Sequence, residues 1–156
     1  MKEFTENINR ILADTYHNAL LMEETKRKYS SAGFTFRDRN AVTFLRNRTG
    51  GTRLSELADY LKISRPSTTT LVKKLEKHGL VERVKDPESD RNTLVKLTRK
   101  GRLFSRYQLR YRQRMAERVS AGFTQEEREI LYKGFCKLNR FFEDSINESE
   151  KIHGRE

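Results

Sequence analysis

The segment from Ser64 to Lys74 has the side chains best suited to chemistry, because it is polar, basic and rich in hydroxyl groups. Hydroxyl groups can bond base edges and phosphates, a threonine methyl can touch the thymine methyl, and arginine can read guanine with paired hydrogen bonds. Lysine can meet phosphates. This residue set predicts DNA contacts through Arg65, Ser67, Thr69, Thr70, Lys73 and Lys74, with Ser64 and Pro66 opening the same segment.

Helical spacing would place these polar side chains on one face. Leu71, Val72 and Leu75 recur at helical steps and must face a core, which leaves the hydroxyl-bearing residues outward. Ser64 is suited to cap this helix, and Gly79 is suited to end it. The competing interpretation is that Ser64 only begins a helix and that the hydroxyl groups are incidental.

A hairpin is expected directly after this helix. Residues 80–85 and 93–97 are rich in Val, Leu and Thr, and they flank a polar loop at residues 86–92. A hairpin that follows a DNA-reading helix can serve as a wing, and Arg91 near its tip would enter the adjacent minor groove. Asp90 either orients that arginine or makes the turn.

Longer helices are expected outside this central part. Apolar residues at three- and four-residue steps predict a helix from Phe4 to Tyr29 and another from Thr98 to Gly122. Thr35 with Asp38, and Thr124 with Glu127, have the spacing of capping boxes for a helix through Leu45 and a last helix through Ser145. With a short helix at 54–61, the sequence predicts a mainly α fold with a small β-hairpin wing.

The charge is concentrated in the middle of the chain. The net charge is +11, and residues 53–114 hold 17 Lys and Arg against 7 Asp and Glu, or +10. A localised basic stretch is typical of a protein that binds a polyanion, although a solvated basic face would look the same. The hydrophobic fraction of 35% is low for a lone globule and favours apolar surface shared with a partner subunit.

Other classes of protein find little support. Cys136 is the single cysteine, so no internal disulfide framework is expected, and its apolar neighbours favour a packed thiol over a sensor. No apolar run approaches the ~20 residues of a membrane span, no secretory signal opens the chain, and a cytoplasmic location is expected. His17, His78 and His153 are scattered, so we expect no metal site, no cofactor, no catalytic residues and no enzyme.

Six short motifs together resemble the MarR family of winged helix-turn-helix regulators. They are Leu54–Ala58, Ile63–Ser67, Leu71–Glu76, Gly79–Arg83, Asp90–Arg91 and Leu97–Gly101, and they follow the family's order over nearly the whole chain. The resemblance implies a homodimer on a palindromic operator, acting as a repressor. It also implies dimerisation helices at 1–34 and 99–147, a DNA-binding lobe at 35–98 and a polar tail at 148–156.

The resemblance implies site residues as well. Arg65, Ser67, Thr69 and Thr70 would face the major groove, and Arg91 would be the wing-tip arginine. This chain departs from the family pattern at two positions. The wing of the family usually has the sequence Asp-x-Arg, and the position of that aspartate is Ser89 here. At the start of the recognition helix, Thr68 occupies a position where the family frequently has a hydrophobic residue. Relatives bind small aromatic or lipophilic acids, and the corresponding cleft would be lined by Tyr16, Phe44, Tyr107 and Tyr111, although aromatic residues at helical spacing are more often core.

Two features leave alternatives open. The helix expected after Thr98 has an arginine at every fourth residue, namely Arg102, Arg106, Arg110, Arg114 and Arg118. These arginines could contact phosphates or an anionic ligand. Alternatively, they form a solvated face of the helix. The basic middle would also suit a non-specific architectural or RNA-binding protein, and a winged helix can serve as a protein-docking module. Binding that depends on salt would exclude a protein-docking module, and binding that survives competition by random DNA would exclude a non-specific protein.

Overall fold

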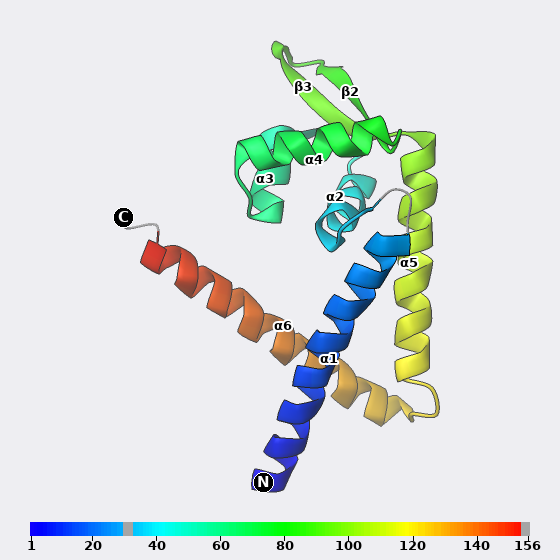
Figure 1. Cartoon of the computed structure of the whole chain (residues 1–156), viewed down its shortest axis with the longest axis vertical. Helices are drawn as coiled ribbons and strands as arrows, with labels where there is room; N and C mark the ends of the chain where they lie inside the picture. Colours follow the sequence, from blue (N-terminus) through cyan, green and yellow to red (C-terminus); the bar gives the residue numbers. More distant parts are fainter. Residues whose placement is uncertain (30–32, 154–156) are drawn as a thin grey trace. The chain divides into compact units, whose positions relative to one another are not determined.

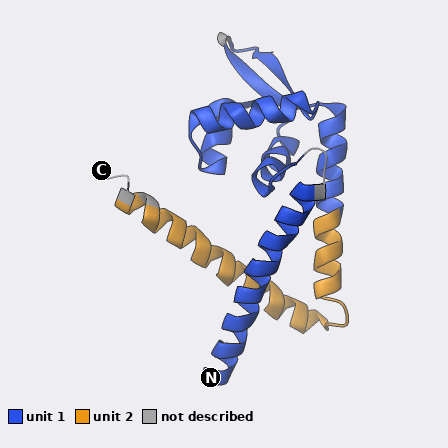
Figure 2. Ribbon diagram, viewed as in Figure 1, with its two compact units in different colours: residues 1–110 blue, residues 111–156 orange. Residues whose placement is uncertain are grey.

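The computed structural model describes residues 1–29 and 33–153, without the side chains of residues 29, 90, 91, 150 and 153. The chain forms two compact units, residues 1–110 and residues 111–156 (Figure 2). The first unit holds the elements that the sequence links to DNA, and each unit is described by itself below.

The elements follow the expected order (Figure 1). The helices are α1 (Lys2–Tyr29), α2 (Phe36–Arg46), α3 (Leu54–Leu61), α4 (Arg65–Lys77), α5 (Arg99–Val119) and α6 (Gln125–His153). The strands are β1 (Thr52–Arg53), β2 (Val81–Asp86) and β3 (Ser89–Leu97), which form one antiparallel sheet in the order β1-β3-β2. The prediction of a mainly α fold with a small β wing is confirmed.

Local hydrogen bonds at the helix ends explain why the boundaries were predictable. Thr35 and Asp38 form a complete capping box at α2, and the Ser64 hydroxyl accepts from the Ser67 amide at the start of α4. The Thr124 hydroxyl and the Glu127 carboxylate bond one another's backbone amides before α6. Such caps satisfy amides that have no partner within the helix.

Four details of the fold differ from the sequence-based expectation. The turn of the hairpin is confined to Pro87 and Glu88, because β2 and β3 extend into the expected loop 86–92. The pairing jumps from Lys85 opposite Thr93 to Asp86 opposite Ser89, so residues 90–92 bulge out of the ladder. Strand β1 is too short to leave a pattern, and α6 continues to His153 rather than ending at Ser145.

The hydrophobic core lies in the winged part of the first unit. Its buried residues come from α2, α3, α4, β2, β3 and the turn between α4 and β2, and they are Ala41, Val42, Leu45, Leu57, Leu71, Val72, Leu75, Leu80, Val81, Val95 and Leu97. Helix α5 begins close against this core, since a Cβ atom at Gly101 would collide with the Leu80 carbonyl oxygen. We call residues 34–104 the lobe.

The long helices present a different surface. Large apolar side chains on α1 and α6 are exposed in the single chain, among them Phe4, Ile8, Ile11, Leu20, Ile130, Tyr132, Phe135 and Phe141. Within the described residues, no helix is long and apolar enough to cross a bilayer. Exposed apolar stripes of this extent are typical of surfaces that another protein chain covers.

Candidate nucleic-acid interface

Helix α4 has two faces of opposite character. Leu71, Val72 and Leu75 are buried in the core of the lobe. The side chains on the other face are exposed, except that Thr69 is half-buried; they are Arg65, Pro66, Ser67, Thr70 and Lys73. The structure therefore brings most of the residues selected from the sequence together on one accessible surface, which we call the α4 face.

The hydroxyl groups of the α4 face are oriented by their own helix. Thr69 Oγ1 donates to the Arg65 carbonyl at 3.0 Å, and Thr70 Oγ1 donates to the Pro66 carbonyl at 3.1 Å. Ser67 Oγ lies 2.9 Å from the hydroxyl oxygen of Ser64. A hydroxyl that donates in this way still offers lone pairs, so the threonine hydroxyls are placed as acceptors for donors such as the amino groups of bases.

Thr68 is accommodated on the inner side of α4 without an unpaired polar atom. Its side chain is fully buried, and its hydroxyl donates to the Ser64 carbonyl at 3.0 Å. A buried hydroxyl is costly only when it lacks a partner. The threonine therefore packs where a hydrophobic residue is frequent in the family resembled, and it does not loosen the start of the helix.

Lys74 differs from the sequence-based expectation. Its Nζ lies 2.6 Å from Oδ2 of Asp38, whose side chain is 6% exposed, and it donates to the Gly33 carbonyl at 2.9 Å. The same ammonium stands 5.5 Å from the centre of the Phe34 ring. Lys74 thus ties α4 to the start of α2, which leaves its ammonium less available to a phosphate than that of Lys73. No sequence pattern indicates this pairing, because Asp38 lies 36 residues before Lys74 in the chain.

The wing is fixed to α4 by a second ion pair. Arg83 Nε on β2 lies 3.4 Å from Oε2 of Glu76 on α4. The side chains of Asp90 and Arg91 lie outside the described residues, although their backbone belongs to β3 close to the hairpin turn. Their roles as brace and wing-tip contact therefore stay predictions.

Arg53 is a basic residue of the wing that sequence reasoning missed. It ends β1, and its guanidinium bonds the carboxylate of Asp86 at the end of β2 with Nη2 3.1 Å from Oδ2. The sequence feature that could have identified Arg53 is its position directly before α3, where Ser, Thr, Asp or Asn is preferred as the N-cap residue. Its side chain makes no cap hydrogen bond.

Of the aromatic residues selected for a ligand cleft, Tyr107 borders a pocket of the first unit. The pocket has a volume of about 440 Å³ and is also lined by Phe34, His78, Leu80, Lys100, Leu103 and Phe104. Phe44 stacks on Tyr60 with ring centroids 4.1 Å apart and lies under the Arg48 guanidinium. Tyr16 is on α1 and does not border this pocket, and Tyr111 belongs to the second unit.

The remaining candidates give mixed outcomes. Cys136 is exposed in the single chain, contrary to the packed setting expected from its neighbours, of which Phe135 and Phe142 are exposed as well. A hydrogen bond with the Cys136 thiol raises the pKa of Tyr132. On α5, both Arg102 and Arg106 are exposed, and Arg102 donates to the Leu97 carbonyl at 2.7 Å. Among the described residues, no cluster of His, Cys, Asp and Glu is suited to a metal ion.

Comparison with known sequences agrees with this reading of the lobe. Residues 45–93 match the MarR family profile. The chain is 29% identical over 107 residues to the HTH-type transcriptional regulator YfiV of Bacillus subtilis, covering 69% of this chain and 67% of that protein. It is 32% identical over 89 residues to YsmB of the same organism, covering 57% and 61%. These matches span less than the full length of the relatives.

Solved structures extend the similarity to the outer helices. FabT of Streptococcus pneumoniae, solved in complex with DNA, superposes with a TM-score of 0.76 at 27% identity and covers 89% of this chain and 97% of its own. A MarR family protein from Bacillus stearothermophilus gives a TM-score of 0.69 at 22% identity, covering 91% and 97%. The second match concerns the fold alone.

Proposed function

We propose that this chain is a transcriptional regulator of the MarR type, with a winged helix-turn-helix and no enzymatic activity, and that it represses transcription as a homodimer on a palindromic operator. The observation that carries the proposal is the two-faced helix α4. Its inner face is buried in the core, while the α4 face offers Arg65, Ser67 and Lys73 to a partner. These side chains suit base edges and phosphates of double-stranded DNA.

The roles within the interface follow from chemistry and position. Arg65, Ser67, Thr69 and Thr70 read bases in the major groove, and Lys73 meets phosphate. Pro66 and Ser64 set the start of the helix, and Arg91, oriented by Asp90, enters the minor groove. Groove-facing hydroxyls and an arginine near the start of a recognition helix are the residue types that such a docking uses.

Dimerisation is supported by the apolar side chains left exposed on α1 and α6, such as Phe4, Ile130 and Phe135. A second copy would cover them and bring two lobes to one duplex. Two recognition helices about 34 Å apart reach successive major grooves, so the operator should be an inverted repeat. A dimer on a promoter excludes polymerase, and this activity belongs with the chromosome in the cytoplasm.

A ligand that releases the DNA is the second part of the proposal. The pocket is lined by apolar side chains and by Lys100, whose Nζ donates to the His78 carbonyl at 2.8 Å. That chemistry suits a small aromatic or lipophilic acid. Phe34 borders the pocket and faces the Lys74 ammonium of α4, so filling the pocket would act on the recognition helix.

The first experiment is selection of bound duplexes from a random library, followed by titration of the selected duplex and random duplex at two salt concentrations. The proposal expects an inverted repeat that is bound far more tightly than random DNA. Thr69→Ala should alter sequence preference, whereas Arg91→Ala should weaken binding to all sequences and lower the salt slope. Selection of no motif, with affinity that only collapses as salt rises, would instead establish an architectural protein.

The ligand is tested separately. Aromatic acids and fatty acids are screened by thermal shift, and each stabilising compound is then added to the complex with the selected duplex. A compound that both stabilises the protein and releases the duplex supports the proposal, and Lys100→Gln should weaken its effect. Compounds that stabilise the protein but leave the DNA bound would remove the ligand from the mechanism.

A further inference from the structure

Arg53 occupies a position that favours other residue types. It directly precedes α3, where a short polar side chain normally accepts a hydrogen bond from a free backbone amide. Arginine has no acceptor to offer, and the structure shows no side-chain cap at this helix. The local preference is overridden, so the reason for an arginine lies in tertiary contacts.

Those contacts fix the guanidinium at the base of the wing. Nε and Nη2 of Arg53 lie 3.2 Å and 3.1 Å from Oδ2 of Asp86. The other oxygen of the same carboxylate accepts from the Glu88 amide at 3.0 Å and so closes the hairpin turn. The Asp86 side chain is 4% exposed, whereas that of Arg53 is 45% exposed. A buried carboxylate therefore holds an arginine whose outer edge reaches solvent.

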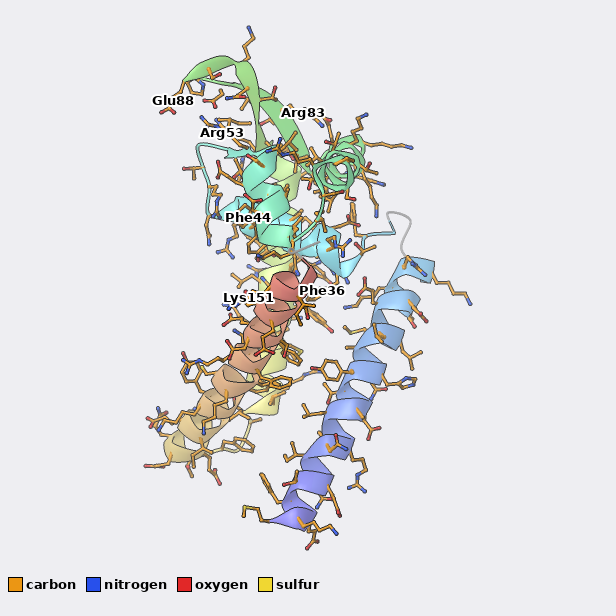
Figure 3. All side chains as sticks on the ribbon, turned by 90° about the vertical axis from the view of Figure 1, so that its left-hand side faces the viewer. Phe36, Phe44, Arg53, Arg83, Glu88 and Lys151 are labelled. Carbon is orange, nitrogen blue, oxygen red and sulfur yellow. The ribbon has the colours of Figure 1, made fainter. Side chains whose placement is uncertain are left out.

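The arginine has donors to spare. Among the described residues, no hydrogen bond uses Nη1 of Arg53. Glu88 is a further acid close to this arginine: its Oε2 lies 3.9 Å from Nη2, and its side chain is 85% exposed, beside Arg53 at the wing (Figure 3). That distance is too long for a hydrogen bond, so a better acceptor would find the outer edge of the guanidinium available.

We propose that Arg53 is a second cation of the wing that binds a backbone phosphate of DNA, with Asp86 as its brace and Glu88 as the carboxylate that phosphate displaces. This inference rests on the proposed function. An arginine that is already oriented loses little freedom on binding, and its planar donors match the oxygens of a phosphate. Since phosphates carry no sequence information, Arg53 strengthens binding to every duplex.

The test removes the charge pair without changing the net charge. In the double variant Arg53→Gln with Asp86→Asn, two amides can still bond one another, so no buried carboxylate is left unpaired. The affinity for both the selected duplex and a random duplex should fall about tenfold for each Arg53 that contacts a phosphate. The slope of log affinity against log salt should shrink by about 0.9 for each.

A matched control is the other ion pair of the wing. The double variant Arg83→Gln with Glu76→Gln also removes one pair of charges, and it should leave the salt slope unchanged. Glu88→Gln should tighten binding to both duplexes by a few fold, since it removes the competitor of phosphate. Thermal unfolding of each variant shows whether the fold is retained.

The possible outcomes distinguish failure of this inference from failure of the proposed function on which it rests. If the unaltered protein selects an inverted repeat but the Arg53 and Asp86 double variant keeps its salt slope, the inference is wrong and Arg53 only neutralises Asp86. If the unaltered protein has no salt-dependent affinity for DNA, both proposals fail. If the double variant is unfolded, the salt titration instead compares Arg53→Lys, which keeps the positive charge, with Arg53→Gln, which removes it. Equal salt slopes for these two variants would also overturn the inference.

Discussion

The lobe and the long helices use their apolar residues in opposite ways. In the lobe, Leu57, Val72, Leu75 and Val95 are buried within one chain. On α6, Ile130 and Phe135 are more than half exposed although the helix is well formed. The lobe therefore completes its own core, whereas α1 and α6 carry large apolar side chains that are exposed in the single chain. The α4 face is thus positioned by packing within one chain, whereas the dimer that we propose would depend on α1 and α6.

The largest effect is expected in the core of the lobe. Leu75→Ala should lower the free energy of unfolding by about 2–5 kcal/mol, because the side chain is fully buried and leaves a cavity. Urea titration measures the change. The control Leu103→Ala, at a half-exposed position on α5, should cost less than about 1 kcal/mol. Equal losses at both positions would contradict the self-contained core.

The next effect should appear in assembly and not in folding of the lobe. Ile130→Glu places a charge among the exposed apolar side chains of α6, and an unpaired charge is costly to bury in an interface. The dissociation constant of the dimer should rise at least about tenfold, measured by sedimentation across a range of concentrations. Ile130→Leu should stay dimeric. A dimer unaffected by the charge would place the interface elsewhere.

Two helical glycines should respond with opposite signs. Gly101→Ala on α5 should destabilise the protein by about 1–3 kcal/mol, because the new Cβ meets the Leu80 carbonyl. Gly134→Ala on α6 meets no atom within 4 Å in the single chain and should stabilise the helix by about 0.5–1 kcal/mol. Thermal unfolding checks both. Loss of the dimer in Gly134→Ala would show that a partner packs against that glycine.

The smallest effect concerns the inner side of α4. Thr68→Val keeps the size of the side chain and removes the hydroxyl that donates to the Ser64 carbonyl, which also accepts from the Thr68 amide. The loss should be about 1 kcal/mol or less, with DNA affinity unchanged. A change in sequence preference without a change in stability would instead assign Thr68 to the groove.

The sequence by itself determined the helices, their caps and the hairpin, because these depend on periodicity and on hydrogen bonds between near neighbours. Ser64, Thr35 and Thr124 begin helices for reasons that a few adjacent residues contain. The outward set on α4 followed from the inward position of Leu71 and Leu75. The resemblance to the MarR family was likewise visible in short motifs, and the family profile matches residues 45–93.

Only the tertiary structure decided which charges are engaged and which remain available. Lys74 and Arg53 look like any other basic residues in the sequence, but Asp38 and Asp86 reach them from distant elements and assign them different roles. Strand β1, the pocket beside Phe34 and the exposure of Cys136 were also beyond local patterns. Each depends on contacts between residues far apart in the chain, and pairing over such distances is set by packing of the whole fold, which no local pattern records.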